Sequence, residues 1–194
     1  DHLMPRTAQQ NQVIRDKRKT KITAEGIKLI SLKGLNNVVI DDIAREVGCS
    51  HGLFYHYYKK TEDLYAAIPE YFLGHKKLLP LCSLCKDVAA AGGAEGIKLL
   101  ADGIAKLPNC PSILVHIVNI AVNNIESLKF FNAYEPIKAL IEAGQKDGTV
   151  KDGEVDDLIL ILISAIKGYV LGILAGGSPI KPIPGSLFAG ILLK

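Results

Sequence analysis

Two clusters of side chains in this sequence could carry out chemistry or bind a partner. The first is Cys82 and Cys85, which have the CxxC spacing of redox dithiols and of zinc sites. A zinc site needs further ligands, and His75 is the one histidine close by in the sequence. A redox dithiol of the thioredoxin type needs a βαβ context, which is not evident here. We therefore expect two buried helical cysteines, no metal and no cofactor, with a thiol-dependent redox protein as the alternative function.

The second cluster is the segment GCSHGLFYHYYKK, residues 48–60, which gathers tyrosines and histidines immediately before two lysines. The polar tips of tyrosine and histidine need partners when they are buried, so this composition does not suit an apolar core. Exposed tyrosine and histidine side chains can donate hydrogen bonds to phosphate oxygens. The alternative is a small hydrophobic junction between two helices. Phe54 and Tyr58, spaced i and i+4, are expected to be buried in either case.

The excess positive charge lies in the first third of the chain. Residues 1–64 hold 11 lysines and arginines against 8 acidic residues, whereas residues 65–194 hold 12 of each. This asymmetry indicates an anionic partner for the amino-terminal region, although a basic solvated tail has the same charge. Four cysteines are too few for a disulfide framework, and the first residues lack the apolar stretch of a signal peptide. The sequence thus favours a cytoplasmic protein.

Apolar residues recur at helical spacing and alternating segments are rare, so the sequence predicts an all-α protein of about nine helices. Helices are expected over residues 19–33, 40–47 and 51–58, and Thr61 is expected to cap a fourth. Gly48 can end the second helix and Ser50 can cap the third. Two short helices joined by a turn of about three residues that contains glycine are typical of a helix-turn-helix.

The rest of the chain is predicted to be a helical bundle. Helices are expected to about residue 79, with a kink or break at Pro69, and then over residues 94–106, 111–125, 132–146, 154–175 and 186–193. Residues 158–175 approach the length of a membrane span, but Lys167 near their middle would make insertion cost about 2.5 to 3.5 kcal/mol. We expect a buried helix and no membrane partner, with a membrane anchor as the alternative.

The amino-terminal region resembles a known family. Residues 22–34 and the run IDDIAREVGCSHGLFYHYYKKTEDL, residues 40–64, look like the DNA-binding domain of TetR-family transcriptional regulators. Further on, residues 144–169, GQKDGTVKDGEVDDLILILISAIKGY, are similar to the join between the family's seventh and eighth helices. The chain departs from the family pattern at Gly26, where alanine is usual and glycine is expected only to loosen the first helix. It departs again at Val38 and Val39, where two threonines are common, and at Thr61, where lysine is frequent.

The resemblance implies a ligand-responsive, sequence-specific regulator of transcription, expected to be a repressor that a small molecule releases from its operator, and not an enzyme. It implies a DNA-binding domain over residues 1–64, with the helix-turn-helix at about 39–58, and an effector-binding and dimerisation domain over residues 65–194. Tyr55 and Tyr57 are expected to contact phosphates, and residues 15–21, RDKRKTK, could add contacts. The expected residues that contact double-stranded DNA are Ser50, His51, Gly52, Leu53, Tyr55, His56, Tyr57, Lys59 and Lys60.

The same resemblance implies a homodimer and a small, hydrophobic effector. His116, Asn119 and Asn123 form one stripe of an apolar segment and are candidates to face the effector, unless this stripe is simply the solvated face of its helix. Further effector candidates are Phe72, His75, Tyr134 and Lys167. The expected dimer interface consists of Ile163, Gly168, Gly172 and Gly176, where GxxxGxxxG spacing lets helices approach closely. Packing within one subunit is the alternative.

Overall fold

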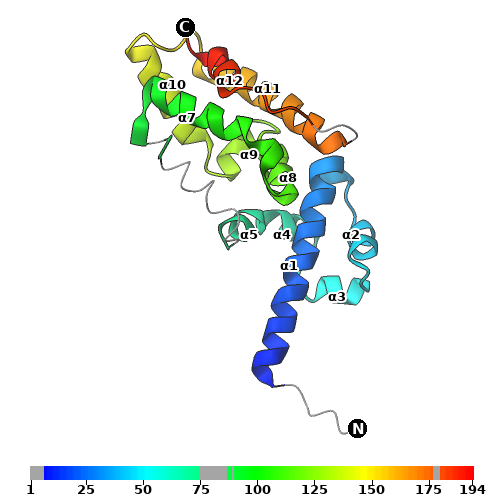
Figure 1. Cartoon of the computed structure of the whole chain (residues 1–194). Helices are drawn as coiled ribbons and strands as arrows, with labels where there is room; N and C mark the ends of the chain where they lie inside the picture. The colour runs from blue at the N-terminus through cyan, green and yellow to red at the C-terminus, as the bar shows by residue number, and fades with distance from the viewer. Residues whose placement is uncertain (1–6, 75–86, 89, 177–179) are drawn as a thin grey trace, which may run out of the picture. The chain divides into compact units, whose positions relative to one another are not determined.

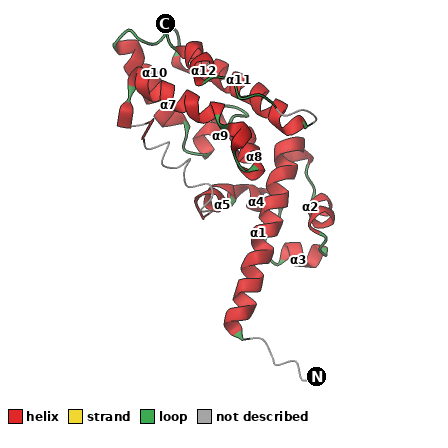
Figure 2. Ribbon diagram, in the orientation of Figure 1, coloured by secondary structure: helices red, strands yellow, loops and turns green. Residues whose placement is uncertain are grey.

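The computed structural model describes residues 7–74, 87–88, 90–176 and 180–194. These residues form helices joined by turns and loops, and no strand occurs among them, so the all-α prediction is confirmed (Figures 1 and 2). They divide into two compact units, one ending at Phe72 and the other beginning at Leu73. The first unit therefore extends beyond the domain end expected at residue 64.

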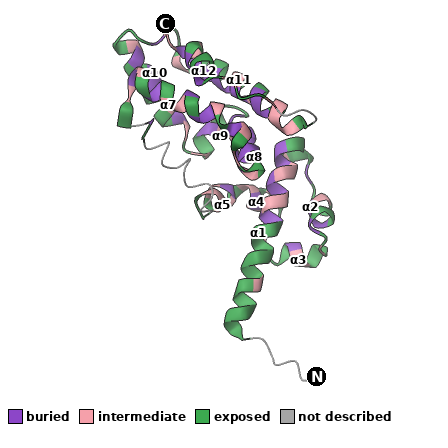
Figure 3. Cartoon of the chain, viewed as in Figure 1, coloured by how far each residue is buried: buried purple, intermediate pink, exposed green. Residues whose placement is uncertain are grey.

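The amino-terminal unit consists of one long helix and several short ones. α1 packs against α2 and α4, and α2 packs against α3. Burial along α1 begins only at Ile22, and the part of the helix before it is mostly exposed (Figure 3). The elements are α1 (Ala8–Lys33), the 3-10 helix η1 (Leu35–Asn37), α2 (Ile40–Val47), α3 (His51–Tyr55), α4 (Thr61–Ala66) and α5 (Ile68–Gly74).

The first helix begins at Ala8, whereas the sequence analysis placed its start at residue 19. Thr7 caps α1: its hydroxyl oxygen accepts from the Gln10 backbone N–H at 3.2 Å, and the Gln10 side-chain oxygen accepts from the Thr7 N–H at 2.9 Å. Such a reciprocal capping box satisfies two backbone donors that the helix leaves open. Apolar periodicity could not reveal this start because the residues before Ile22 are polar and exposed.

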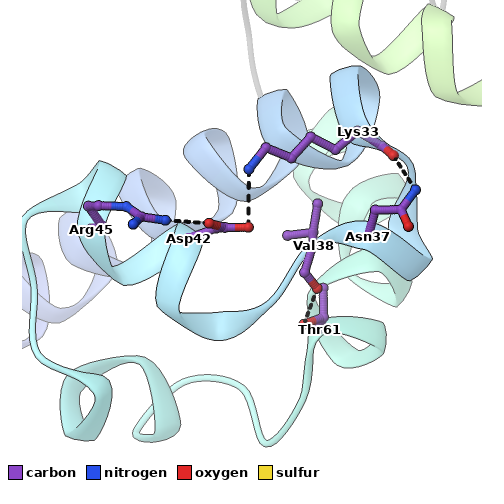
Figure 4. Close-up of polar contacts among 6 residues, drawn as sticks. All are labelled: Lys33, Asn37, Val38, Asp42, Arg45 and Thr61. Atoms are coloured by element: carbon purple, nitrogen blue, oxygen red, sulfur yellow. Dashed lines mark hydrogen bonds and ion pairs between the residues drawn. The ribbon is translucent and has the colours of Figure 1, made fainter.

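Two other expected helix boundaries in this unit are wrong. α3 ends at Tyr55 instead of Tyr58, because the chain turns there and the Tyr58 hydroxyl reaches Thr23 Oγ1 at 2.7 Å. Thr61 does not cap α4 but is its first residue, and its hydroxyl donates to the Val38 carbonyl at 3.4 Å (Figure 4). The Asp63 carboxylate closes this end of the helix by accepting from the backbone N–H groups of the two preceding lysines at 3.1 and 3.2 Å.

Gly26 allows α4 to pack closely against α1. A Cβ atom placed on Gly26 would lie 2.5 Å from Cδ1 of Leu64, which is fully buried. The expectation that this glycine merely loosens α1 is therefore wrong, because the Leu64 side chain fills the space that an alanine methyl group would occupy.

The carboxy-terminal unit is a helical bundle. α7 packs against α10 and α12, and α11 packs against α8, α10 and α12. The core of the unit includes Ile159, Ile163 and Val170 of α11. The elements are α7 (Gly93–Ala105), the 3-10 helix η2 (Leu107–Asn109), α8 (Ser112–Ala121), α9 (Ile125–Phe130), α10 (Tyr134–Lys146), α11 (Val155–Ala175) and α12 (Gly185–Leu192).

One helix that the sequence predicted to be continuous is interrupted, and another breaks close to Pro69, as predicted. The helix expected over residues 111–125 ends at Ala121, and Asn124 caps α9 by accepting from the Ser127 N–H at 2.8 Å. The helix expected through residue 79 breaks before Pro69, which lies in the first turn of α5, where its missing N–H costs no hydrogen bond. His75 and residue 79 lie outside the described residues.

α11 is long and apolar enough to cross a membrane by length and composition. The same composition suits the core helix of a soluble protein, and one side of α11 is buried in its own unit. These buried residues are Leu158, Ile159, Leu162, Ile163, Ile166, Tyr169 and Val170. The burial of this side supports the expected core helix over the membrane anchor.

Candidate nucleic-acid interface

The turn between α2 and α3 has the conformation that the sequence predicts. Gly48 ends α2 with φ 72° and ψ 43°, the left-handed region that a residue with a Cβ atom rarely adopts. The Cys49 N–H donates to the Ala44 carbonyl at 2.9 Å, which closes the last turn of α2. Ser50 then caps α3 by accepting from the Leu53 N–H at 3.3 Å. α2 and α3 are thus joined by Gly48, Cys49 and Ser50 alone.

α3 and the loop that follows it have a buried side and an exposed side. Phe54 is fully buried and Tyr58 is 6% exposed, as expected. Burial raises the pKa of the Tyr58 hydroxyl, which therefore stays protonated as it pairs with Thr23. All the residues predicted to bind DNA are exposed or partly exposed, namely Ser50, His51, Gly52, Leu53, Tyr55, His56, Tyr57, Lys59 and Lys60.

The first turn of α3 combines an oriented imidazole with an open backbone. His51 Nε2 lies 3.1 Å from Asp41 Oδ1 in the first turn of α2, and both side chains are exposed. A Cβ atom on Gly52 would meet only Ser50 Oγ, at 3.9 Å, so packing within the subunit does not require glycine here. The lack of a side chain at Gly52 leaves the helix backbone open to close approach by a ligand.

The start of α2 is fixed by charge instead of by a side-chain cap. Val39 occupies the cap position and makes no side-chain hydrogen bond. Asp42, in the first turn of the helix, pairs with Lys33 at 3.1 Å and with Arg45 (Figure 4). The hydrogen bond from Lys33 lowers the pKa of Asp42, so this carboxylate is charged at neutral pH and ties α2 to the end of α1.

The polar stripe predicted on α8 is mostly buried. His116 is 8% exposed and Asn119 is fully buried, so the alternative of a solvated helix face is wrong for both residues. Asn123 lies beyond the end of α8 and is exposed. Lys167 of α11 reaches the same end of α8, where its ammonium group donates to the Asn119 carbonyl at 2.8 Å and lies 3.5 Å from Asn123 Oδ1. The structure therefore brings three of the predicted effector residues together.

Lys167 has a structural function that the sequence does not indicate. The last carbonyls of a helix lack partners within it, and cations near them are favoured by the helix dipole. Lys167 supplies both a donor and a charge at the end of α8, while its partial burial lowers the pKa of its ammonium group. This contact accounts for the one charged residue of α11 beyond its acidic first turn.

The remaining effector candidates lie elsewhere. The Tyr134 hydroxyl donates to Asp156 Oδ1 at 2.7 Å, and this bond raises the pKa of Tyr134 to about 12. Tyr134 thus links α10 to the first turn of α11. Phe72 is half-buried in the amino-terminal unit, and His75 is outside the described residues.

The four residues predicted at the dimer interface have different surroundings. Ile163 is 2% exposed within its own unit, and a Cβ atom on Gly172 would lie 2.8 Å from Ile180 Cδ1. Gly176 ends α11 with φ 70°. Gly168 is exposed with open space around it. Ile163 and Gly172 thus pack within their own subunit, as the alternative interpretation predicts.

The cysteine pair is not placed by the structure. Cys82 and Cys85 lie outside the described residues, so their burial stays a prediction. Of the cysteines that are described, Cys49 and Cys110 are free and partly buried. No group of three or more His, Cys, Asp or Glu side chains suited to a metal ion occurs in the described part of the chain.

Two short helices, a three-residue turn and an exposed polar face on the second helix define a helix-turn-helix transcriptional regulator. Residues 22–68 match the family described as bacterial regulatory proteins, tetR family. The match covers the helix-turn-helix and its flanking helices, so this part of the chain is similar to the DNA-binding domain of TetR-family transcriptional regulators. A function as a thiol-dependent redox protein is not favoured by this family.

Solved structures of transcriptional regulators share the fold along nearly the whole chain. HlyIIR, a hemolysin II transcriptional regulator, is 16% identical with a TM-score of 0.65, over 93% of this chain and 99% of its own. A gamma-butyrolactone receptor (ArpA-like protein) is 15% identical with a TM-score of 0.61, over 93% and 90% of the two chains. The ketosteroid transcriptional regulator KstR2 of Mycobacterium tuberculosis is 16% identical with a TM-score of 0.55, over 91% and 95%. A comparison with curated protein sequences gives no match.

Proposed function

We propose that this regulator is a cytoplasmic repressor that binds its operator as a homodimer and leaves it when a small, hydrophobic effector binds. The observation that carries the DNA-binding part is the division of α3 and the loop after it: Phe54 and Tyr58 are buried, and the histidine, tyrosine and lysine side chains around them are exposed or partly exposed. The second helix of such a motif lies in the major groove. Residues 50–53 would then face the bases, while Tyr55, Tyr57 and the two lysines after Tyr58 would hold the phosphates.

Replacing Tyr55 and Tyr57 together with phenylalanine is expected to weaken operator binding about 30-fold for each head of the dimer. The change removes two hydroxyl groups, and a hydrogen bond of this kind contributes about 1 kcal/mol. Binding would be measured by fluorescence anisotropy at fixed salt, on a duplex selected by the wild-type protein from a random library. The melting temperature is expected to stay unchanged because neither tyrosine is buried.

Tyr134→Phe provides the matched control, since it removes a tyrosine hydroxyl from the other unit. This variant is expected to lose some stability, because Asp156 loses its partner, and to keep wild-type affinity for the operator. If the Tyr55 and Tyr57 double variant also kept wild-type affinity and an unchanged footprint, the phosphate contacts would be assigned to the wrong residues.

The effector site is proposed to lie in the carboxy-terminal unit, near the buried His116 and Asn119 of α8. Two of the similar structures are named for a ketosteroid and a gamma-butyrolactone, both small uncharged molecules, and the steroid skeleton is largely apolar, which supports a small, hydrophobic effector. Native mass spectrometry of the purified dimer is expected to show a bound small molecule that operator DNA displaces. Effector and operator must oppose each other by the same coupling free energy, commonly about 1 to 3 kcal/mol. If adding this molecule left the affinity for the operator unchanged, the proposal would be contradicted.

The homodimer is proposed to form through the exposed sides of α11 and α12. Leu160, Ile161 and Leu171 of α11 and Leu187 of α12 are large apolar residues that face solvent in the single chain. Exposed apolar surface of this kind marks a site of protein association. Gly168 of α11 and Gly190 of α12 are exposed with open space around them, so they would let a partner helix approach closely.

A further inference from the structure

The amino-terminal half of α1 contains no buried residue. Residues 8–21 precede the first buried residue of the helix, Ile22, and all except the half-buried Ile14 are exposed. At 1.5 Å per residue this segment, the α1 arm, is about 20 Å long. Its dark blue end extends past α3 in Figure 1. A polar helical segment of this length gains little stability from helix propensity alone, so a contact outside the subunit would explain it.

The α1 arm carries a positive charge that the protein does not neutralise. Its one acidic residue, Asp16, accepts a hydrogen bond from the Gln12 side chain at 2.9 Å. Elsewhere Lys28 and Lys129 pair with a glutamate three residues away, whereas within the described ranges no basic residue of the arm forms an ion pair. These basic residues are Arg15, Lys17, Arg18, Lys19 and Lys21. Unpaired charge concentrated on one segment indicates an anionic partner.

The arm is held against the helix-turn-helix at its carboxy-terminal end. The Lys21 ammonium group donates to the carbonyl of Val47, the last residue of α2, at 2.8 Å. The Lys19 ammonium group lies 5.9 Å from the centre of the Tyr58 ring. The Thr23 hydroxyl, one turn further along α1, bonds both the Lys19 carbonyl and the Tyr58 hydroxyl. The carboxy-terminal end of the arm is therefore attached to the end of α2 and to Tyr58, which follows Tyr57 in the chain.

We propose that the α1 arm is a second DNA-binding element, which contacts the phosphate backbone of the duplex that flanks the base pairs read by α3. This inference rests on the proposed operator binding and adds a contact to it. Duplex DNA carries one negative charge per about 1.7 Å of its axis, so an arm of about 20 Å spans several phosphates. Contacts to phosphates carry no sequence information, so the arm adds affinity for flanking DNA of any sequence.

The test compares the full-length wild-type chain with the variant R15Q/K17Q/R18Q on an operator selected by the wild type from random duplexes. Glutamine has nearly the helix propensity of lysine and arginine, so the helix content measured by circular dichroism should be unchanged. The plot of log K against log salt concentration is expected to become shallower by about 0.9 for each phosphate that the variant no longer neutralises, or up to about 2.7 for each head. Affinity for an operator with long flanks is expected to fall at least tenfold.

The variant K98Q/K138Q/K146Q removes the same charge from exposed or partly exposed positions of α7 and α10 in the carboxy-terminal unit and should retain the wild-type salt slope. Removing about six base pairs from each end of the operator, the length that the arm spans, should weaken the wild type but not R15Q/K17Q/R18Q. If R15Q/K17Q/R18Q kept the wild-type slope and affinity on the long operator, the arm inference would be overturned while the proposed function stood. If the wild type selected no sequence at all, the proposed function would fail, and the arm inference with it.

Discussion

Replacing Phe54 with alanine is expected to lower the free energy of unfolding of the amino-terminal unit by about 3 to 5 kcal/mol, the usual cost of deleting a buried phenylalanine ring. Phe54 is fully buried, and the centre of its ring lies 5.9 Å from that of Tyr58. Small domains are commonly stable by about 5 to 15 kcal/mol, so this loss would leave the unit close to unfolding. Urea denaturation of the full chain, followed by circular dichroism, measures the change.

Tyr55→Ala is the matched comparison, because it truncates the adjacent aromatic residue of the same helix. Tyr55 is 55% exposed, so the change is expected to alter stability by less than about 0.5 kcal/mol while weakening operator binding. The Phe54 variant should thus lose stability, whereas the Tyr55 variant should lose affinity for the operator. Equal losses of stability in the two variants would show that α3 does not have one buried and one exposed side.

Local interactions made the helix-turn-helix predictable from the sequence. Ile43, Ala44 and Val47 are buried on one side of α2, as their helical spacing indicates. Gly48 and Ser50 end one helix and begin the next through contacts with residues at most four positions away. Because these contacts join residues close together in the sequence, both the turn and the exposed side of α3 could be predicted.

Elsewhere the prediction failed because the structure depends on contacts between residues that are far apart in the sequence. Lys167 caps α8 by bonding the Asn119 carbonyl, 48 residues away in the sequence, and nothing near Lys167 indicates this partner. Residues 158–163 of α11 are all apolar, so their periodicity could not show that Ile163 faces the core of its own unit while Leu160 and Ile161 face solvent. The surface left for a partner could be identified only after the packing within the subunit was known.

Replacing Ile161 with arginine is expected to dissociate the proposed homodimer without unfolding the subunit. Ile161 is 56% exposed in the single chain, so its own unit can accept the new side chain. In an interface with twofold symmetry the substitution occurs twice, and each guanidinium group would be buried without a partner. The dimer dissociation constant should rise at least 100-fold, as measured by sedimentation equilibrium or by native mass spectrometry.

The neighbouring Ile159→Arg variant separates dissociation from unfolding. Ile159 is fully buried in its own subunit, so its replacement should unfold the carboxy-terminal unit, whereas Ile161→Arg should keep its helix content. A dimeric helix-turn-helix protein reads two half-sites about 34 to 36 Å apart, and a monomer holds one of them only weakly. Ile161→Arg should therefore lose dimer mass and affinity for the two-site operator together. An Ile161→Arg protein that stays dimeric and keeps this affinity would place the interface on another surface.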